Sequence, residues 1–406
     1  MPAGVAITGL GAVTALGGDV GALAAAVVDG RSGIGPLTAF VHQGRCALAA
    51  EVPEGGGGNA LPPPLARRLS RADRFALAAA DQACRQAGLD AGLRREALLY
   101  VGATTGGLRE TEEAYRRRRA GEDRRFRVSR LLGTPLATPA AVVSQVLGVF
   151  GPRATFSTAC SSSALAIAAA ANAIRRGRAR VALAIGCDQL CRLTYAGFDA
   201  LQALDPAPCR PFDRERRGLS LGEGAGALVL EDLEQARARG AKVRALVLGA
   251  GTATDAHHVT APHPDGAGAR AALMAALAAA RLEPAAVDYV NAHGTGTRQN
   301  DAVEIAALRA VFGRHLAHVP ISSSKSQVGH TLAAAGAIEA VVTVLGLEHG
   351  CLPPTLNLRT PDPAWDDLDL VPTAGRRMRI GIAVSSSFGF GGHNVTLVFG
   401  RPEVGG

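Results

Sequence analysis

The sequence predicts an α/β fold made of two similar halves. Short apolar strands alternate along the chain with alanine-rich helices, a pattern typical of a buried sheet covered by helices. In addition, residues 100–107 (YVGATTGG) resemble residues 289–296 (YVNAHGTG), and residues 156–160 (FSTAC) and 321–325 (ISSSK) each precede an alanine-rich helix. These matches predict a duplicated fold with the active site between the halves, although any two α/β units share some likeness.

The expected first half covers residues 1–245. It opens with an apolar strand at 5–10, a glycine-punctuated turn and a helix near 20–28. Residues 109–130 are charge-dense with a helical pattern, which predicts a solvated insertion, and the glycines and prolines of 55–64 predict a surface loop. The other expected elements are helices at 72–87, 139–147 and 161–176 and strands at 98–103, 154–157, 179–186, 225–231 and 243–249.

The expected second half, residues 246–406, repeats this alternation. No clean linker separates it from the first half, so we expect one compact unit. Its expected elements are helices at 268–281, 302–311 and 332–347 and strands at 287–291, 319–323, 379–385 and 394–399.

Composition and charge argue against several classes of protein. The 406-residue chain is 48% apolar and 19% charged, which argues against disorder. Its net charge of +8 would suit an acidic partner, but aromatic residues make up only 4%, which argues against stacking on single-stranded nucleic acid. The seven cysteines are irregularly spaced and include no Cys-x-x-Cys pair, so we expect neither a disulfide framework nor a zinc site.

The ends and the apolar segments give no sign of export or of a membrane span. Residues 1–5 (MPAGV) contain no charged leader, and no segment of about 20 residues is apolar and uncharged. We therefore expect a cytoplasmic protein in a reducing compartment.

Cys160 is the candidate nucleophile. It lies in the segment 157–163 (STACSSS), where an apolar strand ends and a helix begins. A thiol at a helix N-terminus meets the positive end of the helix dipole and free N–H groups, and both favour the nucleophilic thiolate. The alternative is a small buried residue at a tight turn. The remaining cysteines lack this setting and are expected to be inert: Cys46, Cys84, Cys187, Cys191, Cys209 and Cys351.

Two histidines, a lysine and a glutamate in the second half are further candidates. His293 directly follows a strand within the glycine-rich segment 291–297, where glycines let the backbone approach a ligand, and His330 precedes a helix. The alternative for His293 is a side chain satisfied within its turn. Lys325 is one of two lysines in an arginine-rich chain, which indicates a crowded site where a compact ammonium fits. Glu339 lies inside an apolar helix, so its carboxylate should be paired or bound to an ion.

A glycine-rich turn near the C-terminus completes the set. Residues 385–393 (SSSFGFGGH) follow a late strand, and backbone N–H groups in such a turn can hold an oxyanion, the alternative being an ordinary β-turn. A cysteine at a helix start, two histidines after strands of the other half and this turn form a specific combination. Together they predict thioester chemistry.

On these motifs the chain resembles the elongating, type II β-ketoacyl-acyl carrier protein synthases, which are acyltransferases. The likeness extends from residue 5 to residue 399. It implies the thiolase fold, in which two pseudo-symmetric α/β halves pack as a layered α-β-α-β-α sandwich. The matching motifs are TACSS at 158–162, GEGAG at 222–226, NAHGTGT at 291–297, KSQVGHT at 325–331, GAIE at 336–339 and FGFGG at 388–392.

The resemblance implies a role for each candidate. Cys160 accepts an acyl chain from a carrier protein as a thioester. His293 and His330 then support decarboxylation of a malonyl-type extender and stabilise the enolate, whose carbon attacks the thioester. Lys325 favours the neutral form of His330, and Phe390 is the gate that admits the extender only after acylation. The backbone N–H groups of Cys160 and Phe390 hold the oxyanion.

The resemblance also implies partners and binding groups. The protein requires no cofactor of its own, because phosphopantetheine arrives on the acyl carrier protein, and Thr260, Thr295 and Thr297 are expected to bind that arm. The protein is expected to form a homodimer, or a heterodimer with a homologue similar to a chain-length factor. A structural Na⁺ or K⁺ is implied at Asn291, Glu339, Ser385 and Ser386. Candidate docking residues for the acidic carrier, which alternatively form a generic solvated face, are Arg67, Arg68, Arg71, Arg124 and Arg125.

Some residues depart from the family pattern and leave the substrate open. His393 stands where threonine is usual, and Gln202 stands where some members carry a basic docking residue. Fatty acid, polyketide and polyene pathways all remain possible, including a ketosynthase subunit that works with a chain-length factor. An inactive chain-length factor is disfavoured because the nucleophile and both histidines are present. A thiolase is disfavoured because no cysteine follows Cys351, whereas a cysteine thioester hydrolase stays open.

Overall fold

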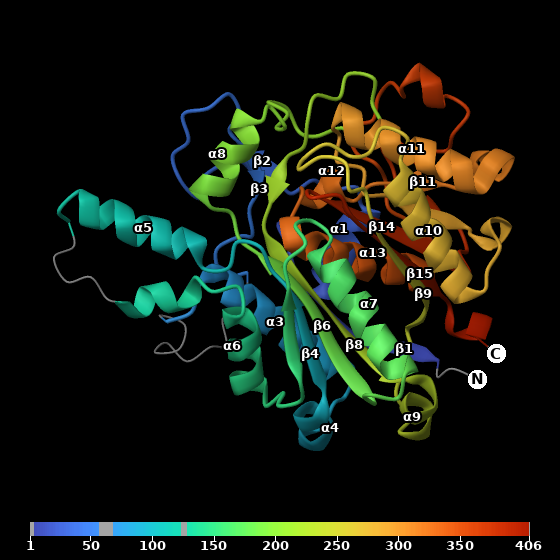
Figure 1. Ribbon diagram of the computed structural model, residues 1–406, viewed down its shortest axis with the longest axis horizontal. Helices are drawn as coiled ribbons and strands as arrows, with labels where there is room; N and C mark the ends of the chain where they lie inside the picture. The colour runs from blue at the N-terminus through green and yellow to red at the C-terminus, as the bar shows by residue number, and fades with distance from the viewer. Residues whose placement is uncertain (1–3, 57–67, 123–127, 406) are drawn as a thin grey trace.

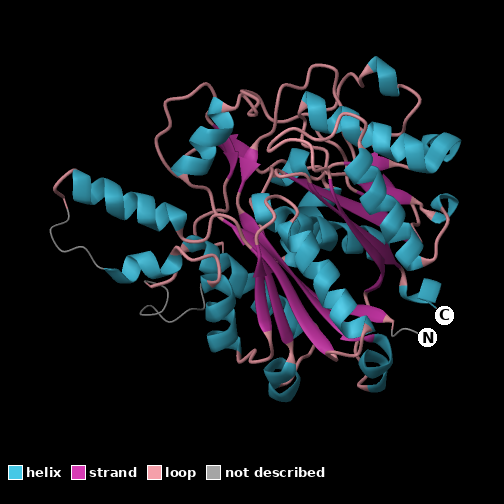
Figure 2. Cartoon of the chain, viewed as in Figure 1, coloured by secondary structure: helices cyan, strands magenta, loops and turns pink. Residues whose placement is uncertain are grey.

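The centre of the molecule is a mixed β-sheet. In the computed structural model, which describes residues 4–56, 68–122 and 128–405, ten strands join into this sheet. Figure 2 shows these strands in magenta with helices around them. One half of the sheet contains, in order from the middle to the edge, β1 (Val5–Val13), β8 (Gly224–Asp232), β6 (Val181–Asp188), β4 (Leu98–Gly102) and β5 (Arg153–Phe156). The other half contains β9 (Ala245–Thr254), β15 (His393–Gly400), β14 (Ile382–Gly389), β10 (Tyr289–Asn291) and β11 (Ile321–Ser322).

The two half-sheets have the same topology. The five strands of each half can be numbered in chain order. From the edge of the sheet to its middle, both halves then have the same strand order: third, second, fourth, fifth, first. In both halves the first strand is antiparallel to the fifth and the fifth to the fourth, and the remaining pairs are parallel. The halves meet where β1 pairs with β9, antiparallel, at Ala6 and Leu246. The structure therefore contains the predicted duplication, and the second set of strands begins at Ala245, while the boundary at 245/246 stays a prediction.

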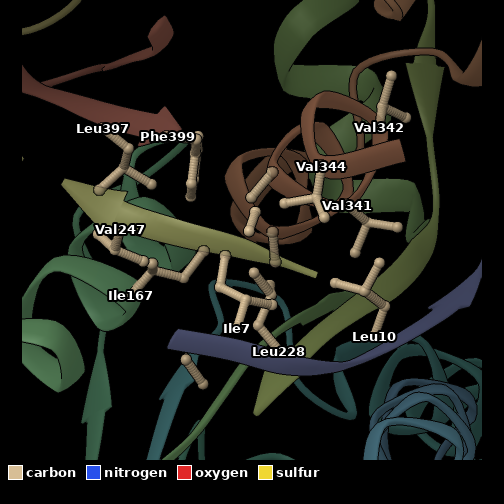
Figure 3. Packing of buried hydrophobic residues seen from close by; sticks show 14 of the residues in the cluster. Ile7, Leu10, Ile167, Leu228, Val247, Val341, Val342, Val344, Leu397 and Phe399 are labelled. Carbon is tan, nitrogen blue, oxygen red and sulfur yellow. The ribbon is translucent and has the colours of Figure 1, made fainter. Parts of the chain in front are cut away.

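Two buried helices lie between the half-sheets. α7 (Ser162–Arg175) packs on β4, β6 and β15, and α13 (Ala335–His349) packs on β8 and β14. Both are apolar on nearly all sides, as expected for helices that contact protein on every side. Figure 3 shows the resulting core, in which Val341 of α13, Leu10 of β1 and Leu397 of β15 belong to one cluster.

Further helices cover the outer faces of the half-sheets. α3 (Arg71–Gln86) covers β1 and β8, and α10 (Ala267–Ala280) covers β9 and β15, with α11 (Arg298–Phe312) beside α10. The contact at α3 is so close that a Cβ atom on Gly11 would lie 1.9 Å from the carbonyl oxygen of Ala79. The order helix, half-sheet, helix, half-sheet, helix is the layered thiolase arrangement that the sequence predicted, and Figure 1 shows it from α3 on one side to α10 on the other.

The remaining elements lie around these layers. The predicted insertion contains α5 (Leu108–Arg119), whose C-terminal turn is exposed as expected, while 123–127 and most of the predicted loop at 55–64 lie outside the described residues. The sequence did not predict the helices α4 (Ala91–Glu96), α8 (Arg192–Ala200), α9 (Leu233–Ala238) and α12 (Lys325–Val328), nor the short strands β2 (Ile34–Pro36), β3 (Leu48–Ala50), β7 (Leu221–Gly222), β12 (Cys351–Leu352) and β13 (Arg376–Arg377). The other helices are α1 (Val20–Val28) and α6 (Thr138–Leu147).

Within the described part of the chain, one helical stretch has the length and apolar character to cross a membrane. This stretch is Leu332–His349, and 89% of it is buried inside the molecule. A core helix has the same properties, so the stretch by itself is weak evidence for a membrane span.

Candidate active site

Cys160 lies where β5 gives way to α7. The preceding residue, Ala159, has a φ of 51°, so the chain turns sharply before the helix starts. Burial raises the pKa of the Cys160 thiol to about 12, and the positive charge of Lys325 only partly opposes this. Desolvation therefore opposes the thiolate that the helix N-terminus was expected to favour.

The two histidines form a pair of neutral donors. Their rings lie 5.4 Å apart and nearly perpendicular. Nδ1 of His293 lies 3.2 Å from Nζ of Lys325, and Nδ1 of His330 accepts a hydrogen bond of 3.3 Å from the N–H of Leu332. Because an ammonium and an amide N–H can only donate, both Nδ1 atoms are acceptors and both ring protons reside on Nε2. Burial lowers the pKa of both rings well below the usual range, and the charge of Lys325 acts in the same direction.

Lys325 connects the histidines to the protein core. It is 1% exposed at the start of α12, and its ammonium donates to the carbonyl oxygen of His293 at 2.6 Å and to the carboxylate of Glu339. Burial raises the pKa of Glu339 to about 6, against the opposing effect of Lys325. The expected pairing of Glu339 is therefore present, and the lysine occupies a crowded site.

Glu304, which the sequence analysis missed, holds the loop of His293. It lies on the buried face of α11, and its two carboxylate oxygens accept the N–H groups of His293 and Gly294 at 2.7 and 2.8 Å. Burial raises its pKa to about 7. A glutamate among the apolar positions of the helix predicted at 302–311 was the available signal.

One cavity brings together residues from both halves. It has a volume of about 460 Å³ and is lined by Cys160, His293 and His330. The three threonines expected to bind the phosphopantetheine arm also line it, and Oγ1 of Thr295 lies 2.9 Å from Oγ1 of Thr297. The cavity thus brings hydroxyl groups together with the thiol and both imidazoles. The threonines are Thr260, Thr295 and Thr297.

The turn between β14 and β15 closes over the nucleophile. The backbone of Phe390 lies at the sulfur of Cys160, where it lowers the pKa of the thiol against the larger, opposing effect of burial. A Cβ atom on Gly389 would lie 2.6 Å from the carbonyl oxygen of Thr158, so only glycine permits this approach. The ring of Phe390 stacks on Phe198 of α8 at 5.5 Å, a contact that the sequence analysis missed together with the helix.

The residues implied for a monovalent cation lie on neighbouring elements. Asn291 of β10 is the Cα partner of Ser385 of β14, and Ser386 is buried next to it. Oδ1 of Asn291 and Oε2 of Glu339 are buried without hydrogen-bond partners. Oxygen donors that lack partners suit a hard cation, so the residues fit Na⁺ or K⁺. Across the described residues, no three His, Cys, Asp or Glu side chains come together as a metal site.

The predicted docking arginines are only partly placed. Arg68 is exposed, whereas Arg67, Arg124 and Arg125 lie outside the described residues. The guanidinium of Arg71 pairs with the buried carboxylate of Glu223 at 2.6 Å, which ties this arginine to the fold and leaves its side chain only 19% exposed. Two arginines that the sequence analysis did not single out, Arg217 and Arg298, line the cavity and are exposed.

The fold and the site together define a thiolase-fold condensing enzyme. Models of the beta-ketoacyl synthase N-terminal and C-terminal domains match residues 3–236 and 244–359, and the chain belongs to the β-ketoacyl synthase family. It is similar to 3-oxoacyl-[acyl-carrier-protein] synthase 2 of Synechocystis sp., with 38% identity and 97% coverage of both chains. It is also similar to nodulation protein E of Rhizobium meliloti, with 40% identity and coverage of 97% of this chain and 98% of the relative. Among solved structures, the ishigamide ketosynthase/chain length factor matches with a TM-score of 0.92, 34% identity and coverage of 99% of this chain and 100% of that chain.

Proposed function

We propose that the protein carries out the decarboxylative Claisen condensation of a β-ketoacyl-acyl carrier protein synthase, with Cys160 as the acyl acceptor. The observation that carries this proposal is the pair of neutral imidazoles, His293 and His330, with their protons on Nε2 beside the same cavity as the thiol. Two N–H donors stabilise a developing enolate oxygen without acting as a strong base.

The first half-reaction loads the acyl chain. The sulfur of Cys160 bonds to the carbonyl carbon of the acyl thioester, and the backbone N–H groups of Cys160 and Phe390 stabilise the oxyanion. The carbon–sulfur bond to the carrier then breaks. The departing carrier thiolate takes up the proton that the thiol loses.

The second half-reaction lengthens the chain. The malonyl thioester loses CO₂, and the electron pair of the broken bond forms an enolate held by Nε2–H of His293 and His330. The enolate carbon bonds to the acyl carbonyl carbon, and the sulfur of Cys160 leaves as a thiolate that regains a proton. The products are a β-ketoacyl carrier protein extended by two carbons, CO₂ and the free enzyme.

A cysteine thioester hydrolase is less consistent with this geometry. A hydrolase would need a histidine oriented by a carboxylate. Instead, Nδ1 of His293 faces the ammonium of Lys325, and Nδ1 of His330 faces an amide N–H.

The proposed partner is an acyl carrier protein. Thr260, Thr295 and Thr297 would hold the phosphopantetheine arm, and the exposed arginines at the cavity would receive the negative charge of the carrier or of its phosphodiester. The names of the relatives support an acyl carrier protein as substrate carrier and a chain-length factor as one possible partner subunit. A homodimer is the other possible assembly.

Three further points belong to this proposal. The protein acts in the cytoplasm, which is supported by seven free cysteines, six of them buried.

A structural Na⁺ or K⁺ would offset the buried carboxylate. It would be held by Asn291, Glu339, Ser385 and Ser386. The product enters a fatty acid, polyketide or polyene pathway.

Intact-mass spectrometry tests the function. The purified protein is mixed with a panel of acyl carrier proteins and then with malonyl carrier protein. We expect an acyl adduct that is absent in Cys160→Ala and is chased to a β-ketoacyl carrier product. Hydrolysis of the adduct with no condensation product would support the hydrolase instead. Failure with every primer, repeated with a co-expressed partner subunit, would reject Cys160 as the nucleophile.

A further inference from the structure

A hydrogen-bonded pair outside the catalytic motifs, His42 and Asp199, connects α8 to the loop between β2 and β3. Nε2 of His42 lies 2.9 Å from Oδ2 of Asp199, with the two side chains 13% and 9% exposed. The same oxygen accepts the backbone N–H of Arg45 at 3.1 Å. The hydrogen bond from His42 holds the pKa of Asp199 below its usual range, so the carboxylate is charged at neutral pH.

Gly44 lies so close to this pair that no larger side chain fits at its position. A Cβ atom at Gly44 would lie 1.7 Å from Oδ2 of Asp199 and 2.1 Å from Nε2 of His42. Gly44 is not among the glycines with positive φ, so its backbone conformation does not itself require glycine. The space filled by the His42–Asp199 pair is therefore what excludes a larger residue.

The helix that carries Asp199 also carries one side of the gate. Phe198, the neighbouring residue, stacks on Phe390 with ring centres 5.5 Å apart and planes inclined by 18°. One turn earlier, Tyr195 contacts the ring of His42 at 4.8 Å and donates to the carbonyl oxygen of Leu48 at 2.9 Å. Asp199 and Tyr195 thus fix the helix segment that presents Phe198.

The other end of α8 is fixed independently. The carboxylate of Glu112 accepts the N–H groups of Arg192 and Leu193, both at 2.8 Å. Breaking the His42–Asp199 pair therefore removes the contact nearest to Phe198, at the end of α8 that lines the cavity, while the contacts of Tyr195 to Leu48 and of Glu112 to the N-terminal end remain.

We infer that the His42–Asp199 pair is a positioning device that holds Phe198 against Phe390 and keeps the gate in its resting position. The inference rests on the proposed function, in which Phe390 admits the extender only after Cys160 is acylated. Without the pair, the malonyl thioester reaches His293 and His330 too early. It then loses CO₂, the enolate takes a proton from water, and acetyl carrier protein forms without a new carbon–carbon bond.

The test compares two breaking variants with a matched control. Asp199→Asn keeps the shape of the side chain and removes its charge, and Gly44→Ala displaces the pair sterically. Gly35→Ala is the control, because Gly35 lies in the adjoining strand β2 and a Cβ atom there meets nothing within 4 Å. Thermal melting shows that each variant is folded, and Asp199→Asn alone decides the test if Gly44→Ala does not fold.

Two rates are measured for each protein. One is CO₂ release from malonyl carrier protein in the absence of acyl primer, and the other is condensation after acylation. We expect the ratio of the first to the second to rise about fivefold in both breaking variants, the effect of losing one hydrogen bond to a charged carboxylate, and to stay unchanged in the control. His42→Gln keeps a hydrogen-bond donor, so it should raise this ratio less than Asp199→Asn does.

Other results would overturn the inference. An unchanged ratio in folded Asp199→Asn would show that the pair has no influence on the gate. An equal fall of both rates would show a merely structural role. If the wild-type protein condenses, failure of the variants to uncouple rejects only this inference, whereas a wild type that never condenses rejects the proposed function with it.

Discussion

At the scale of single residues, the site is defined by which groups burial leaves neutral and which it leaves charged. Cys160 and both histidines lose their charged forms because desolvation penalises them. Lys325 instead keeps a carboxylate partner, Glu339, in the same buried region. One ammonium therefore fixes the tautomer of His293, and neutral imidazoles face the cavity as donors.

The thiol character of Cys160 has a direct test. Because its pKa is raised to about 12, the fraction of thiolate at neutral pH is small, and alkylation by iodoacetamide should accelerate about tenfold per pH unit from about pH 7 to pH 9. Peptide mass spectrometry separates this adduct from that of the partly exposed Cys351. A rate that levels off near pH 7 would show a thiolate and contradict the assignment.

Lys325→Met should be strongly destabilising. It leaves the carboxylate of Glu339 buried without its partner, which costs about 3–5 kcal/mol of the free energy of unfolding. The double variant Lys325→Met/Glu339→Gln should regain much of that loss, because no unpaired charge remains. Denaturant unfolding of the wild type, both single variants and the double variant measures the coupling, and additive effects would contradict the pairing.

At the scale of elements, α11 positions the catalytic loop. Its N-terminus carries Thr297 and Arg298 at the cavity, and its buried face carries Glu304, which binds the N–H groups of the loop. On the opposite side, Gly389 lets the turn after β14 approach the start of α7. Each catalytic group thus depends on an element that is itself packed in the core.

The buried carboxyl group of Glu304 makes the free energy of unfolding depend on pH. Its pKa is raised from an ordinary 4.5 to about 7, so the folded protein holds this proton more tightly than the unfolded chain. The stabilisation is complete below about pH 4.5 and is lost as pH rises through about 7, by about 3 kcal/mol in total. Glu304→Gln lacks this loss. As the pH rises from 4.5 to above 7, the unfolding free energy of the wild type should therefore fall relative to that of Glu304→Gln. A difference that rises over this interval would contradict the prediction.

At the scale of the whole molecule, charge and topology act together. The duplicated half-sheets bring the N-terminal nucleophile and the C-terminal histidines to one cavity, and exposed arginines stand beside it. Arg217 and Arg298 are close because the N–H of Gly218 donates to the carbonyl oxygen of Gly296 at 3.1 Å. A net charge of +8 would strengthen the attraction of the proposed acidic carrier.

Charge reversal at the cavity should distinguish binding of the carrier protein from reaction with the acyl group. We expect Arg217→Glu/Arg298→Glu to raise the KM for an acyl carrier protein about tenfold or more and to reduce its dependence on salt. Acylation of Cys160 by a small acyl thioester without phosphate should proceed at the wild-type rate. If both substrates lose activity equally, the arginines support the fold rather than docking.

The sequence was most informative where chemistry depends on local pattern. Cys160 at a strand-to-helix junction, His293 after a strand and the glycines around Phe390 all had local signals, because turns and helix starts impose short-range requirements on residue type. The strands of the half-sheets were also readable from their apolar runs. The short strands and the helices α4, α8, α9 and α12 were not, since elements of this size are stabilised by what they pack against.

Sequence by itself determined the class of fold and the family, and it predicted the nucleophile and its histidines. Tertiary structure decided the burial of Cys160, the partners of Arg71 and Lys325, the hydrogen bonds of Glu304 and the stacking of Phe198 on Phe390. The reason is physical: desolvation and pairing depend on neighbours that are distant in the chain. Only the folded arrangement brings those neighbours within hydrogen-bonding distance.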